Sequence, residues 1–266
     1  SAPILPLASF ADLEAYLDGL GLFRMQPGLD RISAVLEHLG LKRPPFGVVQ
    51  VVGTNGKGST STILASLGRA HGLRVGLHTS PHFLSVRERI RVNGAMLGEK
   101  TWLSLGNQLL AAGGNTLSYF ELVTVLAVMA FAEAKVHLAV METGLGGSFD
   151  ATTALEADMV VFTPFGLDHQ AVLGPTLRDI ARDKAGAVRQ GKPVVSAVQS
   201  PEAQEEICRA AQEQHAPILS LDDSHTVPTS NLNLRLPGAY QKDNAALALA
   251  AWRGMKETFG KDWGLS

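Results

Sequence analysis

The sequence predicts an α/β protein with a doubly wound, mainly parallel sheet flanked by helices. First, short runs of β-branched residues alternate with segments of helical length, which is typical of βαβ units. Second, several of these runs are apolar with almost no alternation, as expected for strands that helices cover on both faces. Third, the chain has 266 residues, of which 45% are hydrophobic, so it can bury a large core.

The expected elements follow one another along the whole chain. The expected strands lie at 47–53, 74–79, 137–143, 158–165, 193–198 and 217–221. The expected helices lie at 12–20, 29–39, 59–71, 117–134, 176–190 and 201–215, where the length and the spacing of apolar residues are helical. After residue 231, a Pro-Gly turn precedes an Ala- and Leu-rich helix. We expect a single domain over 1–266, in which 237–266 form a helix and a linker.

Composition and charge disfavour several classes of function. The formal net charge is -2 and there is no long block of like charges, so nothing favours nucleic acid or an anionic membrane as a partner. The apolar stretch from Leu122 to Ala132 is too short to cross a bilayer and is expected to form a core helix. The amino end has no basic segment before an apolar core, so a secretory signal is not expected. The one cysteine, Cys208, is expected to be a small buried hydrophobe in a cytoplasmic protein.

The segment VVGTNGKGST at 51–60 predicts a phosphate-binding loop, because it lies between a buried-type strand and a helix expected to start near Ser59. Glycines allow the tight turn, and successive backbone N–H groups and the helix N-terminus then face an anion. Lys57 would reach the terminal phosphates. The alternative is a glycine-rich turn, since the spacing departs from G-x-x-x-x-G-K-[ST]. The residues expected to hold a nucleotide are Gly53, Thr54, Asn55, Gly56, Lys57, Gly58, Ser59 and Thr60.

The motif G-T-N-G-K-G-S resembles the phosphate loop of the Mur ligase superfamily, and Gly58 with its surroundings resembles the folylpolyglutamate synthase and dihydrofolate synthase branch. The resemblance covers most of the chain in the family's order. Its other segments are YLDGLGLFRMQPGLDRISAVLEHLG, HTSPHFLSVRERIRVNG, LSYFELVTVLAVMAFA, METGLGGSFDAT, LDHQAVLGPTLRDIARDKAGAVRQGKP and LPGAYQKDNAALALAA. The resemblance implies a P-loop-containing central domain of the Mur ligase type, with ATP and Mg²⁺ as cofactors.

Polar side chains follow three of the expected strands and should converge on the edge where the phosphate loop lies. They are Ser80, Glu142 and Asp168 with His169. By resemblance, Ser80, Glu142 and His169 correspond to the family's magnesium ligands. Without the resemblance, a hydrogen-bonded structural role is favoured for His169, and Glu142 fits a solvated carboxylate at a strand end equally well.

Lys184, in RDKAG, lies on an expected amphipathic helix, where a lysine is usually part of the solvated face. The family's matching lysine is carbamylated, so the resemblance implies that CO₂ adds to the uncharged amine of Lys184. Burial near other cations allows a lysine to lose its proton. The resemblance thus gives catalytic roles to Lys57, Lys184 and His169.

The resemblance also implies a substrate pocket. Asp150 matches the family's pterin-recognising aspartate, with Ala151 beside it, and a carboxylate can accept paired hydrogen bonds from an aminopyrimidine. Phe120 matches an aromatic residue of the pteroate pocket, although core packing is an equal alternative. Arg87 could line a mobile loop over the site together with Arg89, or both could belong to a solvated charged strand.

Two further positions bear on the resemblance. Gln241 and Asn244 match a motif whose asparagine meets the adenine, and their spacing puts them on one helix face. Ser148 stands where the family usually has Arg, which removes any contact that the arginine would make.

The reaction that the resemblance implies is ATP-dependent ligation of L-glutamate to dihydropteroate, or to the γ-carboxylate of folate polyglutamates, through an acyl phosphate. The expected partners are these small molecules, and the expected state is a monomer. The family also has a carboxy-terminal α/β domain, which would begin near Ser266, so weak or no activity is expected from this chain alone. The alternatives are a Mur-type cell-wall ligase and a catalytically incompetent ATP-binding fragment. A guanine-specific switch is disfavoured because the sequence has no N-K-x-D string.

Overall fold

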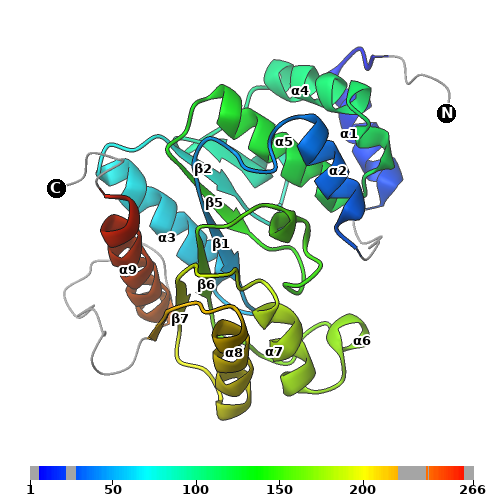
Figure 1. The fold of residues 1–266 in the computed structure, drawn as a ribbon. Helices are drawn as coiled ribbons and strands as arrows, with labels where there is room; N and C mark the ends of the chain where they lie inside the picture. Colours follow the sequence, from blue (N-terminus) through cyan, green and yellow to red (C-terminus); the bar gives the residue numbers. More distant parts are fainter. Residues whose placement is uncertain (1–5, 22–27, 221–237, 239, 261–266) are drawn as a thin grey trace.

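The strands form one mixed sheet in the order β4-β3-β2-β5-β1-β6-β7-β8 (Figure 1). The computed structural model describes residues 6–21, 28–220, 238 and 240–260. In chain order the strands are β1 (Gly47–Val52), β2 (Val75–His78), β3 (Ile90–Val92), β4 (Ala95–Met96), β5 (Leu138–Glu142), β6 (Met159–Phe162), β7 (Val194–Ser196) and β8 (Ile218–Ser220). The strands from β2 to β8 in the sheet are parallel, and β3 is antiparallel to both β2 and β4. The predicted fold class is confirmed.

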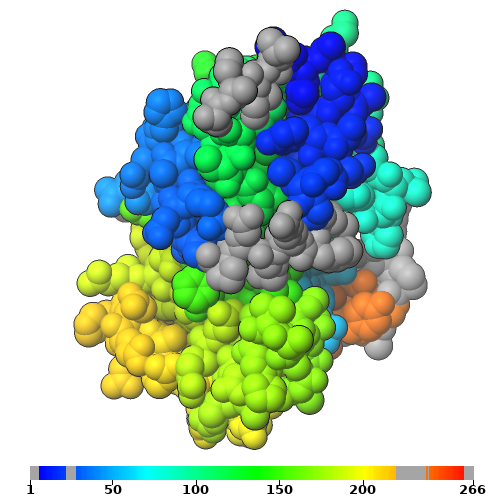
Figure 2. All heavy atoms as spheres, turned by 90° about the vertical axis from the view of Figure 1, so that its right-hand side faces the viewer, coloured from blue at the N-terminus to red at the C-terminus, as the bar shows by residue number. Residues whose placement is uncertain are grey.

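Helices cover both faces of the sheet (Figure 1). The helices are α1 (Phe10–Leu20), α2 (Asp30–His38), α3 (Lys57–Ala70), α4 (Glu99–Ala111), α5 (Tyr119–Glu133), α6 (Gln170–Leu173), α7 (Leu177–Ala185), α8 (Pro201–Glu213) and α9 (Tyr240–Phe259). Because side chains alternate along a strand, Val49 and Val51 of β1 pack against α3 and α9, whereas Val48 and Val52 face the other helices. Figure 2 shows the amino-terminal helices in blue above α6, α7 and α8 in yellow-green to yellow.

Helix α5 lies at the centre of the larger core. It is apolar around its whole circumference, and Leu122, Val125 and Phe131 are fully buried. A helix of this kind belongs inside a globular core when it is too short for a bilayer. The helix expected from Leu122 to Ala132 is thus confirmed, and no described helix is long and apolar enough to cross a membrane.

The sheet places its functional edge at the end of β1. The chain leaves β1 through α3 to reach β2 on one side, whereas β6 pairs with β1 on the other side. In open parallel sheets, ligands bind outside the carboxyl ends of the strands at such a switch point. The loops that follow β1, β2, β5 and β6 therefore meet at this edge.

Several features differ from the expectations. Cys208 is exposed rather than buried, because α8 turns Ala203, Ile207 and Ala210 toward the core and leaves Cys208 on the outer face. The β3–β4 hairpin was not predicted, since strands of 3 and 2 residues are too short to show alternation. Helix α4 was also missed, and the helix expected at 176–190 ends at Ala185. Residues 221–237, 239 and 261–266 of the expected elements lie outside the described residues.

Candidate active site

The loop between β1 and α3 is shaped by two glycines. Gly53 has φ 157°, and a Cβ there would overlap the side chain of Thr163. Gly56 has φ 83°, and a Cβ there would overlap the carboxamide of Asn244. Helix α3 begins at Lys57, two residues earlier than expected, so the glycine at Gly56 is its N-cap. Both positions exclude a side chain, which explains why the loop needs glycine there.

The amide groups of the loop divide into two sets. The N–H groups of Thr54 and Asn55 donate to the Pro164 carbonyl over 3.2 and 3.3 Å, so they are engaged by the loop after β6. The Thr54 hydroxyl bonds to Gly166 as both donor and acceptor. The N–H groups of the first helical turn have no intrahelical partner and are the ones available to an anion. Of the predicted set, Thr60 is buried and its N–H already donates to the Gly56 carbonyl.

Two lysines converge on one carbonyl oxygen of this loop. The Lys57 ammonium donates to the carbonyl oxygens of Gly53 and Thr54 over 3.1 and 3.3 Å. Lys184 reaches the same Gly53 oxygen from α7 over 3.0 Å, although 131 residues separate the two. Lys184 is only 3% exposed, and burial, followed by the charge of Lys57, lowers its pKa to about 8. The interpretation of Lys184 as a solvated face residue is therefore wrong.

Glu142 lies at the end of β5, on the other side of the loop. It is 3% exposed, accepts a 3.1 Å hydrogen bond from the Ser80 N–H and lies beside Gly58. Burial raises the pKa of Glu142 to about 7, against the opposing effects of Lys57 and the Ser80 bond. Glu142 is therefore not a solvated carboxylate, and the sheet brings it together with Ser80 as predicted.

His169 and Asp168 lie in the loop after β6 and are both half exposed. His169 has φ 52° and is the N-cap of α6. Its Nε2 lies 3.4 Å from the Asp168 carboxylate. Within the described part of the chain, no hydrogen bond or ion pair joins His169 to Glu142 or Ser80, and no group of three His, Cys, Asp or Glu residues is arranged to hold a metal ion.

The donor set at the loop nevertheless suits a hard cation. The Glu142 carboxylate and the Ser80 hydroxyl are oxygen ligands of the kind that Mg²⁺ prefers. Mg²⁺ usually takes few protein ligands and completes its octahedron with water and phosphate oxygens. Glu142 is buried next to the phosphate loop without a salt bridge among the described residues, so its charge is free to meet a cation there.

The carboxylate of Asp150 accepts hydrogen bonds from its own loop. Its Oδ2 accepts hydrogen bonds from the N–H groups of Gly144 and Leu145 over 2.8 and 3.0 Å. Its Oδ1 accepts from the Thr152 N–H and hydroxyl over 2.9 and 2.6 Å. A carboxylate offers about four lone-pair sites, and these bonds use them all. Asp150, 4% exposed, therefore holds the loop after β5 together, with Ala151 buried beside it.

Phe120 lies beneath this loop. Its half-buried ring lies 5.6 Å from the ring of His78 and contacts Gly144. His78 is fully buried, and burial lowers its pKa to about 3, so the ring is neutral. The Phe120 ring thus packs against the loop after β5, whose N–H groups donate to Asp150. Ser148, in the same loop, donates its hydroxyl to the Asp183 carbonyl of α7.

Arg87 does not point toward the phosphate loop. Its guanidinium donates to the Leu97 carbonyl over 3.0 Å and pairs with Glu99 over 3.2 Å, at the start of α4. These contacts bind Arg87 to the segment that joins β4 to α4. The structure therefore does not bring it together with Lys57, Glu142 and Lys184.

Helix α9 carries the predicted adenine motif to the loop. Gln241 and Asn244 are buried, and the Asn244 amide donates to Gln241 over 3.1 Å. Asn244 Oδ1 lies directly over Gly56. The spacing predicted a shared helix face, and this is confirmed.

Comparisons with known proteins agree with this geometry. No family model matches the chain. The dihydrofolate synthase/folylpolyglutamate synthase of Bacillus subtilis (strain 168) is 34% identical over an alignment 270 residues long, which covers 91% of this chain and 63% of that protein. The protein of the same name from Escherichia coli (strain K12) is 38% identical over an alignment 264 residues long, which covers 93% of this chain and 60% of that protein. The structure of E. coli FolC in complex with DHPP and ADP superposes with a TM-score of 0.83 and 36% identity, over 94% of this chain and 63% of that chain.

The chain is similar to the dihydrofolate synthase/folylpolyglutamate synthases over more than nine tenths of its own length. The resemblance seen in the sequence is thereby confirmed. The chain spans 63% and 60% of the length of these two relatives.

From the sequence, Arg89 could belong to a mobile loop over the site or to a solvated charged strand, and the structure shows that it is a buried cation. Arg89 is 3% exposed, donates to His82 Nδ1 over 2.8 Å and lies 5.4 Å from the centre of the Tyr119 ring. It also acts electrostatically on Glu142. The interpretation of Arg89 as part of a solvated strand is wrong. Its position in the R-E-R-I segment gives no signal that distinguishes it from the partly exposed Arg87.

A groove of about 630 Å³ starts at the phosphate loop. Its residues come from the loop, one face of α3, the inner face of β2 and the segment after β2. Glu88 lines it, and the Glu88 carboxylate accepts from the N–H groups of Phe83, Leu84 and Ser85. These three bonds lower the pKa of Glu88 to about 2. The groove lining is Gly56, Gly58, Ser59, Thr62, Ala65, Ser66, Arg69, Val75, Leu77, Thr79, Ser80, Pro81, Phe83, Glu88, Arg91, Gly94 and Glu142.

Proposed function

We propose that the intact protein uses ATP to join L-glutamate to dihydropteroate or to folate polyglutamates, releasing ADP and phosphate. The observation that carries this proposal is the convergence of Lys57, Lys184 and Glu142 on one phosphate loop. The names of both relatives support it, and so does the E. coli FolC structure, which holds DHPP and ADP. Because the chain spans less than two thirds of either relative, the activity is proposed for the intact protein.

Phosphoryl transfer at this site requires positioning and charge neutralisation more than covalent catalysis. The N–H groups at the start of α3 would bind phosphate oxygens, and Lys57 would exchange its bond to the Thr54 carbonyl for a bond to the terminal phosphates. An oxygen of the substrate carboxylate attacks the γ-phosphorus, and ADP leaves. The amine of L-glutamate then attacks the acyl carbon of the acyl phosphate, and inorganic phosphate leaves with the formation of the amide.

Glu142 and Ser80 would hold Mg²⁺, with His169 as a third candidate ligand. When bound, Mg²⁺ would neutralise part of the charge on the phosphates. Asn244 and Gln241 would lie near the adenine, since α9 carries them to the edge of the loop. Phe120 and Ala151 would line the pteroate pocket. The hydrogen bonds of Asp150 support a role in shaping that pocket rather than direct pterin contact, and those of Arg87 support a position outside the pocket.

We also propose that Lys184 is carbamylated in the active enzyme. Its amine is buried and its lowered pKa favours the neutral form that CO₂ requires. The added carboxylate would place a negative charge near Lys57. Extra density on the Lys184 amine in a nucleotide-bound crystal supplied with bicarbonate is the expected result. A plain amine under those conditions would disprove carbamylation.

The ligase proposal is tested by ADP release from the intact protein with ATP, Mg²⁺ and L-glutamate. We expect dihydropteroate or tetrahydrofolate to stimulate ADP release. Lys57→Ala should abolish the stimulation, whereas Lys100→Ala, at an exposed site on α4, should retain it. Stimulation only by a UDP-muramoyl substrate would identify a cell-wall ligase instead. No stimulation by any acceptor would contradict the ligase proposal.

A further inference from the structure

The loop after β5, residues 143–150, is bound by hydrogen bonds to the last turn of α7. The Gly147 N–H donates to the Asp183 carboxylate over 2.9 Å. The Ser148 N–H and hydroxyl both donate to the Asp183 carbonyl oxygen, over 2.9 and 2.8 Å. Asp183 therefore accepts hydrogen bonds from two successive residues of this loop, and Lys184 follows it directly in the chain.

The loop and α7 are also in direct contact. A Cβ on Gly147 would overlap the backbone of Asp183 and Lys184. A Cβ on Gly186 would overlap the Ser148 hydroxyl. Glycine at both positions allows this close approach. The loop cannot shift relative to the turn that carries Lys184 without breaking these contacts.

Buried hydrogen bonds hold the same loop from the side of β1. The Thr153 hydroxyl donates to the Gly147 carbonyl over 2.7 Å. The Gln50 amide of β1 donates to the Thr153 and Thr152 hydroxyl oxygens over 2.6 and 2.8 Å. Because the Thr152 hydroxyl donates to the Asp150 carboxylate, which can only accept, the direction of these bonds is fixed. The Gly147 peptide group is thus held at its carbonyl as well as at its N–H.

Lys184 needs an anchor because its charge is poorly placed. Its ammonium shares the Gly53 carbonyl with that of Lys57, and two like charges repel each other. No carboxylate of the described residues pairs with Lys184 in a salt bridge. The lysine stem is flexible, so the side chain alone does not fix the amine. The position of the amine therefore depends on where the backbone of α7 is held.

We infer that Asp183 is a positioning residue, which holds the Lys184 amine at the phosphate loop through its hydrogen bonds to Gly147 and Ser148. The contacts run from the loop after β5 through Asp183 to Lys184, and from Lys184 to Gly53. Two segments that lie far apart in the sequence thereby determine the place of one amine.

The contact gives the proposed reaction a fixed geometry. The loop after β5 packs at Gly144 against Phe120 of the proposed pteroate pocket. The inference rests on the proposed function, because a substrate in that pocket must meet a nucleotide at the phosphate loop. Small displacements of reacting groups reduce rates strongly. Loss of the Asp183 contacts should therefore lower kcat more than it raises either KM.

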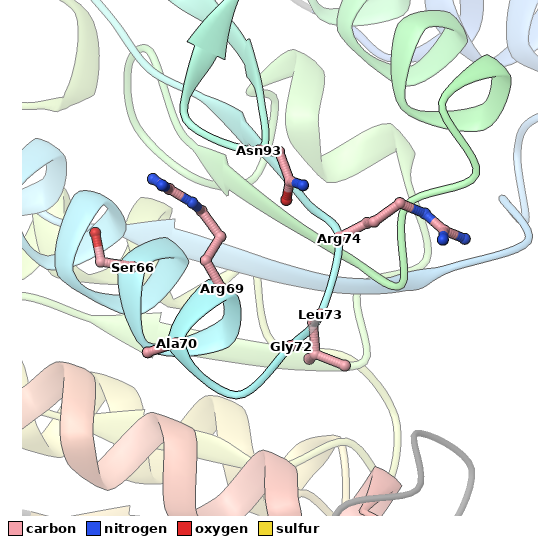
Figure 3. Close-up of a pocket in the computed structure, with 7 residues that line it drawn as sticks. All are labelled: Ser66, Arg69, Ala70, Gly72, Leu73, Arg74 and Asn93. Atoms are coloured by element: carbon pink, nitrogen blue, oxygen red, sulfur yellow. The ribbon is translucent and has the colours of Figure 1, made fainter.

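Two arginines supply matched controls. Arg182 precedes Asp183 on α7, but its exposed side chain pairs with Glu206 of α8 over 3.4 Å. Arg69 lies in the last turn of α3, about 18 Å from the start of the helix at 1.5 Å per residue. Figure 3 shows it beside a hollow of about 580 Å³ that Asn93 also lines. Replacing either arginine removes a charge from an element of the site without removing a bond to the loop after β5.

The first test measures whether Lys184 stays buried in the intact protein. Lysine amines are reductively methylated in buffer free of bicarbonate, and mass spectrometry compares Lys184 with the exposed Lys100 of α4. We expect Asp183→Ala to speed the methylation of Lys184 about tenfold or more, as the loss of a hydrogen bond to a charged group implies. Asp183→Asn keeps an oxygen acceptor for the loop and should stay within about threefold of the wild type. Arg182→Ala and Arg69→Ala should leave the rate unchanged.

The second test measures ADP release with ATP, Mg²⁺, L-glutamate and dihydropteroate. Asp183→Ala should lower kcat about tenfold or more and change the KM values for ATP and dihydropteroate less than about threefold. Asp183→Asn should recover most of kcat, and both arginine variants should retain it. Unchanged circular dichroism and melting temperature show that the variants are folded. If Asp183→Ala does not fold, Ser148→Ala removes only the hydroxyl bond and should speed the methylation of Lys184 about threefold.

Three outcomes would overturn the inference. They are an unchanged methylation rate of Lys184 in folded Asp183→Ala, a raised KM for dihydropteroate with unchanged kcat, and equal losses in Arg182→Ala. The methylation test needs no substrate, so it reports on Asp183 even if the protein is not a ligase. Absence of ADP release from the wild type would contradict the proposed function alone.

Discussion

Lys184 is a buried amine whose charge the fold disfavours. Burial lowers its pKa from 10.5 to about 8, so between these values the unfolded chain binds more protons and stability rises with pH. Below pH 8 the full penalty for burying the ammonium is present. We expect Lys184→Met to raise the free energy of unfolding at pH 7 by on the order of 1–3 kcal/mol. This advantage should shrink between pH 8 and pH 10.5.

Denaturant unfolding at pH 7 and at pH 10 measures this difference, with Lys100→Met on the exposed face of α4 as the control. An advantage of the same size at both values would show that Lys184 is not held as a desolvated cation.

Asp150 allows a structural role to be separated from a substrate role. Its carboxylate accepts only from N–H and O–H donors of its own loop. Asp150→Asn would turn an amide N–H₂ toward one pair of these donors and leave buried groups without partners. We expect a loss of about 2 kcal/mol or more in the free energy of unfolding, measured in urea. Asp168→Asn, half exposed, is the control; a raised KM for the pterin with unchanged stability would instead favour direct contact.

The residues of the site differ in how far the sequence predicts them. Lys57 and the glycines lie in a continuous motif, and Glu142 and Ser80 each end a strand, so topology alone brings them together. The burial of Arg89 and the hydrogen bonds of Asp150 within its own loop could not be predicted. Both depend on where the loops after β2 and β5 direct their N–H groups and rings, which is a property of backbone conformation rather than of residue type.

At the scale of elements, the contact between α9 and the phosphate loop can be tested with two glycines of the same φ. Gly56 and Gly72 both have φ 83°, but only at Gly56 would a Cβ overlap another residue, Asn244. Either substitution by Ala costs about 1–2 kcal/mol for the left-handed backbone. We expect Gly56→Ala to weaken ATP binding at least tenfold in addition, because Asn244 must move. Calorimetric titration with ATP checks this, and equal affinities for the two variants would mean that α9 does not position the loop.

Elements with a strong apolar pattern were predicted, whereas α4 and the β3–β4 hairpin were not. β1, β5 and α5 carry runs of apolar residues long enough to identify them, and they form the centre of the molecule. The β3–β4 hairpin turns at Asn93 and Gly94, both with positive φ, and this pair is a strong hairpin signal. The signal was missed because each strand beside it is so short. That omission concealed Arg91 as a lining residue of the groove.

At the scale of the whole molecule, nucleotide binding should stabilise the fold through the loop between β1 and α3, which contacts Lys184 of α7 and Asn244 of α9. A ligand at 100 times its Kd adds about 2.7 kcal/mol. For a chain of this size we expect ATP with Mg²⁺ to raise the melting temperature by about 5–10 °C. Thermal unfolding followed by circular dichroism measures the shift, and Lys57→Ala should remove it. A shift that persists in Lys57→Ala would place the nucleotide elsewhere.

The parallel sheet and its ligand edge follow from the alternation of strands and helices, and both were predicted. The groove from the phosphate loop to Arg69 could not be predicted in this way. Its walls come from α3, β2 and the hairpin, and its shape depends on how these three pack. A one-dimensional pattern contains the order of elements but not the space left between them.

The segment after β2 combines two properties that usually exclude each other. Phe83 and Leu84 are 93% and 95% exposed, yet their N–H groups, with that of Ser85, are bound by the Glu88 carboxylate. In hydrogen exchange, such a surface segment should therefore be as slow as an ordered turn, since each of these amides must break a charged hydrogen bond before its proton can leave. The large exposed fractions of Phe83 and Leu84 therefore do not show that this segment is mobile. An apolar surface that is held in one conformation meets a ligand with little loss of conformational entropy.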